Sequence, residues 1–143
     1  MHRDVRRIYA AFELYLDLHY ILHGFVQSDY ENTIIYACIA EATLRPRVVR
    51  DGKPPAPLGA SDGNGSISRL LVADRTGLPR ETVRRKIGAM ITSGMLVRVA
   101  RSSVAISLRP FASNADDVGK AVARYHARVT ELAGEEGKPD GTD

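Results

Sequence analysis

The sequence predicts a mainly α-helical protein with one small β-hairpin. Apolar residues recur every three or four positions near both ends of the chain, which is typical of amphipathic helices. Two short β-prone runs, 96–100 and 104–108, flank Arg-Ser-Ser, which indicates a hairpin. With 143 residues, 44% of them hydrophobic, the chain can bury one modest core. We therefore expect one domain with appended helices.

The N-terminal part predicts two helices and a loop. Residues 4–25 form a long amphipathic helix whose apolar face is Val5, Ile8, Phe12, Tyr15, Leu16 and His19/Leu22. Asp29 is placed to cap a second helix, which we expect to end at Pro46. The following stretch, 46–65, is rich in Pro and Gly and predicts a long loop.

The central part predicts two short helices and the hairpin. Ser68 is a suitable N-cap, and Gly77 lies where the first of these helices must stop and the chain reverse. Its inward face is expected to be Leu70, Leu71 and Ala73. Pro79 suits the first turn of the next helix, which ends near Gly94. Helix, tight turn, helix and hairpin is the order of a winged helix-turn-helix.

The C-terminal part predicts one more helix. After residue 117, apolar side chains repeat with spacing four, three, four, three at Val118, Val122, Tyr125, Val129 and Leu132. Barely two heptads are too few for an independent coiled coil, so this stripe is expected to pack on the first helix, on a partner subunit, or on both. The tail 134–143 has no apolar residue to bury and is expected to be disordered. These elements suggest three regions, 1–65, 66–110 and 111–143.

Charge is concentrated in the middle region. The chain carries a net charge of +3, yet residues 66–110 hold nine Lys/Arg and two acidic residues, a net +7. Residues 1–65 carry −1 and residues 111–143 carry −3. A basic module between neutral or acidic arms predicts a polyanionic partner, most simply double-stranded DNA. A solvated basic surface is the alternative.

The stretch ADRTGLPRETVRRKIGAMITSGMLVR resembles the helix-turn-helix of bacterial transcription regulators. Its RETV segment is similar to that of the catabolite-activator family, and the flanking helices and small size resemble most the MarR family (multiple antibiotic resistance regulators). The resemblance implies a homodimer built from the N- and C-terminal helices. We expect a cytoplasmic protein that acts as a repressor on a near-palindromic operator. It also implies a small-molecule effector pocket, for which the aromatic residues of the first 36 positions are candidates; a plain core is the alternative.

The second helix of the central module predicts how DNA would be bound. Val83, Ile87, Met90 and Ile91 fall on its inward face, and Glu81, Arg85 and Gly88 lie opposite. We expect Arg84 or Arg85 to contact guanine, and Glu81 to accept from cytosine or to hold Arg85. The predicted DNA contacts are Ser68, Arg80, Glu81, Thr82, Arg84, Arg85, Lys86, Arg98, Arg101, Ser102 and Ser103, with Arg80 and Lys86 on phosphate and the hairpin residues on the backbone or minor groove. The predicted dimerisation residues are Ile8, Phe12, Tyr15, Val118, Val122, Tyr125 and Val129.

Other classes of function have weaker support. His19 and His23 lie one helical turn apart but have no third ligand at a fixed spacing, and Cys38 lies among apolar residues without a nearby cation, so neither a metal nor a redox site is expected. No phosphate-binding glycine loop or nucleophile motif occurs, so we expect neither an enzyme nor a cofactor. The apolar runs fall short of the ~18 residues of a membrane span, and no membrane partner is expected. The alternative to a DNA-binding regulator is a winged-helix adaptor whose basic face meets an acidic protein.

Overall fold

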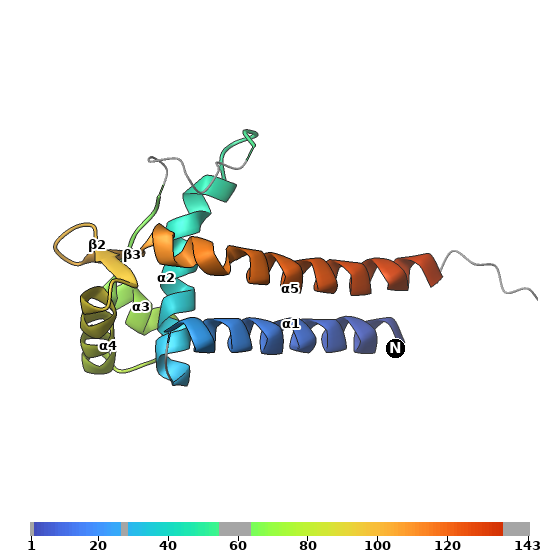
Figure 1. Ribbon diagram of the computed structural model, residues 1–143, viewed down its shortest axis with the longest axis horizontal. Coiled ribbons are helices and arrows are strands. Elements are labelled where there is room, and N and C mark those ends of the chain that lie inside the picture. Colours follow the sequence, from blue (N-terminus) through green and yellow to red (C-terminus); the bar gives the residue numbers. More distant parts are fainter. Residues whose placement is uncertain (1, 27–28, 55–63, 136–143) are drawn as a thin grey trace, which may run out of the picture. The chain divides into compact units, whose positions relative to one another are not determined.

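The computed structural model describes residues 2–26, 29–54 and 64–135, and it is mainly helical with a small three-stranded antiparallel sheet in that part of the chain (Figure 1). The elements are, in order, α1 (His2–Val26), α2 (Tyr30–Val48), β1 (Ile67–Ser68), α3 (Arg69–Thr76), α4 (Arg80–Thr92), β2 (Leu96–Arg98), β3 (Ser103–Ile106) and α5 (Leu108–Glu135). The chain forms two compact units. The terminal-helix unit lies within Met1–Leu22 and Asn114–Asp143, and the central unit lies within His23–Ser113.

The sheet of the central unit has the strand order β1-β3-β2. The β2–β3 pairing confirms the expected hairpin, with Leu96 opposite Ile106 and Arg98 opposite Val104. β1 was not expected, because two residues carry no readable alternation. It pairs Ile67 with Val104 and so makes β3 the central strand of the sheet.

The core of the central unit is shared by α2, α3, α4 and the sheet. Its fully or nearly fully buried apolar side chains are Ile35, Tyr36, Ile39, Ile67, Val72, Ala73, Val83, Ile87, Met90, Leu96, Val104, Ala105 and Ile106. The inward face expected for α3 was wrong in part, because Leu70 and Leu71 are exposed while Val72 and Ala73 are buried. An eight-residue helix has too few turns for apolarity alone to fix which side faces inward.

α2 does not end at Pro46 as expected but continues to Val48. Proline lacks an N–H, so in a helix it leaves the carbonyl four residues earlier without its usual donor. In this last turn of α2, the next carbonyl, that of Thr43, accepts the backbone N–H of Gly65 at 2.9 Å. A Cβ on Gly65 would collide with the Ala42 carbonyl oxygen, so glycine allows the returning chain to lie directly against α2.

Thr43 joins α2 to the sheet from inside the core. Its side chain is fully buried. The hydroxyl donates to the Ile39 carbonyl at 2.8 Å and accepts the backbone N–H of Ile106 at 3.1 Å. This bond supplies an acceptor to the β3 N–H on the side of the strand away from β2.

α5 begins at Leu108, well before the expected start after residue 117, and Leu108 is therefore not part of the hairpin. Pro110 stands in the first turn, where its missing N–H has no helical partner to lose. Gly134 and Glu135 belong to α5. The rest of the tail 134–143, residues 55–63 of the 46–65 loop and the Leu132 side chain lie outside what is described.

In the terminal-helix unit, α1 and α5 lie side by side (Figure 1). Arg124 of α5 binds Asp17 of α1 at 2.9 Å, and Arg128 binds Glu13 at 2.9 Å. Rising numbers on α5 meet falling numbers on α1, so the two helices are antiparallel. Arg128 also holds the pKa of Glu13 below its ordinary value by hydrogen bonding to the carboxylate. Among the side chains described in this unit, the buried apolar ones are the small residues Ala10 and Ala121.

Candidate functional site

α4 is held with one face in the core and the opposite face in solvent. Val83, Ile87 and Met90 are buried, as the spacing predicts, and Ile91 is half-buried. The entry to α4 is a tight turn at Gly77, whose φ of 72° is readily adopted only by glycine and whose N–H donates to the Ala73 carbonyl at 2.9 Å. The next residues, Leu78 and Pro79, lead directly into α4, so the turn fixes where its first residues stand.

The solvent face of α4 is cationic in its first turns and bare further along. Arg80, Arg84 and Arg85 are exposed, Thr82 is half-buried, and Gly88 and Ala89 leave the following turn without a long side chain. Nothing lies within 4 Å of the position that a Cβ on Gly88 would occupy. A rod-shaped partner can therefore approach the backbone of α4 at this turn.

Glu81 pairs with Arg84 rather than with Arg85. The Arg84 Nε donates to Glu81 Oε2 at 3.0 Å, and its Nη2 donates to Oε1. This hydrogen bonding holds the pKa of Glu81 below its usual value and raises the pKa of Arg84. Within the described ranges neither Arg85 nor Arg80 makes an ion pair, so these two guanidiniums can bind a partner without first leaving a carboxylate.

Lys86 is directed toward α2 and away from the exposed face. Its side chain is 15% exposed, and its ammonium lies 2.8 Å from Asp29 Oδ2 and 3.9 Å from Glu31 Oε2. The hydrogen bond from Lys86, followed by that from the Asn32 N–H, lowers the pKa of Asp29. Lys86 was expected to contact phosphate, but in the structure its side chain connects α4 to the beginning of α2.

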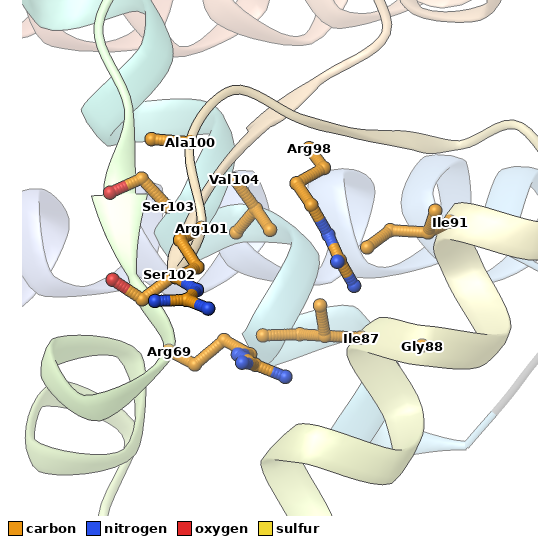
Figure 2. Close-up of a pocket in the computed structure, with 10 residues that line it drawn as sticks. All are labelled: Arg69, Ile87, Gly88, Ile91, Arg98, Ala100, Arg101, Ser102, Ser103 and Val104. Atoms are coloured by element: carbon orange, nitrogen blue, oxygen red, sulfur yellow. The ribbon is translucent and has the colours of Figure 1, made fainter.

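The hairpin residues gather at one hollow beside α4 (Figure 2). Arg101 and Ser102 are exposed at the β2–β3 turn, Ser103 is half-buried, and Arg98 lies across the strand pair from Val104. Ser68 caps α3 by accepting the Leu71 N–H at 3.1 Å. The hollow is also lined by Ile87, Gly88 and Ile91 of α4, which brings the hairpin and the exposed edge of α4 to the same place.

Arg69 is a candidate residue that sequence reasoning missed. It lines the same hollow as Arg98 and Arg101, and its backbone N–H donates to the Ser102 carbonyl at 3.2 Å. Its place directly after a helix cap is the only sequence signal. The proximity of Arg69 to the hairpin depends on the pairing of β1 with β3. A two-residue strand such as β1 leaves no pattern in the sequence from which this pairing could be predicted.

The predicted dimerisation residues lie in the terminal-helix unit with different exposures. Ile8, Phe12 and Tyr15 are 55%, 64% and 54% exposed. Val122 is also exposed, and Val118, Tyr125 and Val129 are half-buried. The α1 residues that were expected to pack thus face solvent, because the side of α1 next to α5 carries Ala10, Glu13 and Asp17 instead.

Three other candidates stay without support from the geometry. His19 stacks against Tyr15 with ring centroids 6.4 Å apart, and in the described residues no three His, Cys, Asp or Glu side chains gather to hold a metal. Burial raises the pKa of the Cys38 thiol, which disfavours the thiolate needed for redox chemistry. A hollow of about 240 Å³ between α1 and α5 is lined by Tyr20 and by charged side chains including Asp17 and Lys120, and it is open to solvent.

None of the helices described is both long enough and apolar enough to cross a membrane. Comparison of the chain with protein-family models, curated proteins and solved structures finds no match. The functional proposals below therefore rest on the residues and geometry of this chain.

Proposed function

We propose that the chain is a sequence-specific DNA-binding transcriptional regulator of the winged helix-turn-helix type that acts as a homodimer. The observation that carries this proposal is the placement of α4. One face is locked in the core, while the other presents arginines and then a bare turn beside a hollow lined by further arginines. An α-helix of this kind fits the major groove, and the cations beside it suit the phosphate backbone.

In this proposal α4 reads base pairs with its first turns. Arg85 is the principal candidate because its guanidinium is not engaged by a carboxylate of the described chain, and the fork of an arginine matches the O6 and N7 acceptors of guanine. Arg84 would first have to break its ion pair with Glu81 before contacting a base or phosphate, which lowers its net contribution to the binding free energy. Gly88 and Ala89 let the groove wall approach the backbone of the helix.

A second copy of the chain is the proposed partner for the outer face of α1. That face carries seven large apolar or aromatic side chains, each exposed by more than half: Val5, Ile8, Tyr9, Phe12, Tyr15, Leu16 and Tyr20. An apolar surface of this kind is typical of an interface rather than of a monomer in water. A symmetric dimer buries the same patch on both copies and presents two α4 helices to two half-sites about 34 Å apart. An effector that changes this separation would release the DNA, and occupation of a promoter would repress it.

The test is selection of random DNA duplexes by the purified protein near physiological salt, followed by titration of the selected duplex and a scrambled one. A palindrome with a large affinity ratio is the expected result. Arg85→Ala is expected to lose about 1–3 kcal/mol on the selected duplex and to broaden the preference for one base pair. Arg109→Ala is the matched control, because it removes an exposed cation of the central unit that lies neither on α4 nor at the hollow.

Enrichment of no sequence, together with no binding of any duplex at low salt, would refute the proposal. Capture of an acidic protein under the same conditions would then favour the adaptor. Equal losses for Arg85→Ala and Arg109→Ala would show instead that α4 does not read bases.

A further inference from the structure

Three arginines from separate elements line one hollow of the central unit (Figure 2). Arg69 begins α3, Arg98 ends β2, and Arg101 lies in the β2–β3 turn. Figure 2 shows their side chains around the same space, with Arg98 reaching toward Ile91 and Arg69 lying beside Ile87. We call this space the arginine hollow.

The sheet register explains why the three meet. Ile67 and Arg98 both lie opposite Val104, one on each side of β3, so the three residues form a row across the sheet. Cross-strand partners point to the same face of a sheet. Arg98 is therefore on the face of buried Ile67 and Val104, which is the face toward α4. The bond from the Arg69 N–H to the Ser102 carbonyl then fastens the start of α3 to the hairpin turn.

The lining of the hollow favours an anion. No acidic side chain belongs to it, and its remaining polar groups are the hydroxyl-bearing Ser102 and Ser103. None of the three arginines forms an ion pair with a carboxylate of the described ranges. Arg84 and Arg128, by contrast, each pair with a glutamate. Like charges held together against apolar walls repel one another, and a bound anion removes that repulsion.

Phosphate is the anion that the hollow fits best. Guanidinium forks and hydroxyl donors suit a group with several acceptor oxygens around one centre, and arginine binds phosphate with paired hydrogen bonds. The enclosed part of the hollow holds about 20 Å³, which is room for a water molecule or for one oxygen of an anion seated at the mouth. Gly88 lines the hollow, and nothing lies within 4 Å of the position that a Cβ on this residue would occupy.

We propose that the arginine hollow is a phosphate-binding site. Building on the proposed function, its occupant is a phosphate of the DNA backbone, held beside the base pairs that α4 contacts. Because the register and the Arg69–Ser102 bond assemble the site without DNA, free inorganic phosphate binds there too and competes with the duplex.

The experiment uses the full chain and two probes. Inorganic phosphate is added to the protein in a sulfate-free buffer, where it replaces chloride at constant ionic strength. The backbone amide resonances of Arg69, Arg98 and Ser102 are followed by NMR. Saturable shifts at these amides are expected in the wild type and in Arg109→Gln, and they are expected to be lost in Arg69→Gln. The same proteins are then titrated with a DNA duplex across salt concentrations.

With DNA, Arg69→Gln is expected to bind every duplex about tenfold more weakly or worse, and to lower the slope of log affinity against log salt by about 1. Arg98→Gln and Arg101→Gln are measured in parallel, so that the site is still tested if Arg69→Gln fails to fold by circular dichroism. Arg109→Gln, the matched control, is expected to keep the wild-type slope.

The outcomes separate the site from the proposed function. Phosphate shifts that require Arg69, without binding of any duplex, would support the site and refute the DNA-binding function. Duplex binding whose salt slope is unchanged in all three hollow variants, with no saturable phosphate shifts, would overturn the site and leave the function standing.

Discussion

Replacement of Thr43 by valine is expected to destabilise the central unit through one hydrogen bond. The two side chains have nearly the same shape, so the change removes the hydroxyl without opening a large cavity. The Ile106 N–H loses the acceptor at 3.1 Å and stays buried against α2. An unsatisfied buried donor costs about 1–3 kcal/mol. For a unit of about 90 residues, a loss of ~2 kcal/mol lowers the melting temperature by roughly 10 °C.

Urea unfolding and amide hydrogen exchange measure this effect together. Thr43→Ser is the control, because it keeps the hydroxyl and loses a single methyl group. Exchange at Ile106 is expected to accelerate in the valine variant and to stay slow in the serine variant. If Thr43→Val unfolded at the wild-type urea concentration with Ile106 still protected, the hydroxyl would not be the partner of this N–H, and the reasoning would fail.

Two further predictions concern α4. Gly88→Ala is expected to raise the free energy of unfolding by about 0.5–1 kcal/mol, since alanine favours a helix and its methyl meets no atom, yet to weaken DNA binding by filling the approach to α4; thermal melting and duplex titration measure both, and tighter binding would place Gly88 outside the interface. Lys86→Gln is expected to lower stability at pH 7, because the pKa of Asp29 is depressed in the folded state and the stabilisation exists above its unfolded value of about 4. The gap between wild type and Lys86→Gln should shrink as urea titrations move below pH 4, and a constant gap from pH 7 to pH 3 would exclude the Asp29 carboxylate as its source.

Much of the local structure followed from signals carried within a few residues. Asp29 and Ser68 cap their helices as predicted, with side chains accepting the Asn32 and Leu71 N–H groups. Gly77 ends α3 with a left-handed φ of 72°. These features are readable because one side chain or one backbone angle decides each of them.

The misses arise where distant parts of the chain decide. Pro46 stays within α2 because a helix can continue for a turn beyond a proline, and the Gly65 segment packs at that turn. β1 exists because β3 offers it a partner, not because of its own two residues. The start of α5 at Leu108 was missed for a local reason instead, because the β-prone run 104–108 was assigned to the hairpin up to its last residue.

The candidate site shows the same division. Helical spacing predicted that Val83 and Met90 would be buried and Arg85 exposed. It could not predict that Lys86, on the flank of α4, would meet Asp29, which lies 57 positions earlier. Arg69 escaped notice for the same reason, since its neighbours at the hollow come from the hairpin.

One carboxylate ties the beginning of α2 to α4. Asp29 Oδ1 accepts the Asn32 N–H at 3.0 Å, while Oδ2 accepts from Lys86 at 2.8 Å. Serine, threonine and asparagine usually replace aspartate at a helix cap with little loss. Here none of them supplies a second, charged oxygen for the ammonium. Asp29 is therefore the residue type that serves both contacts at this position. Replacement by serine, threonine or asparagine would keep the helix cap but remove the ion pair that holds α4 to α2.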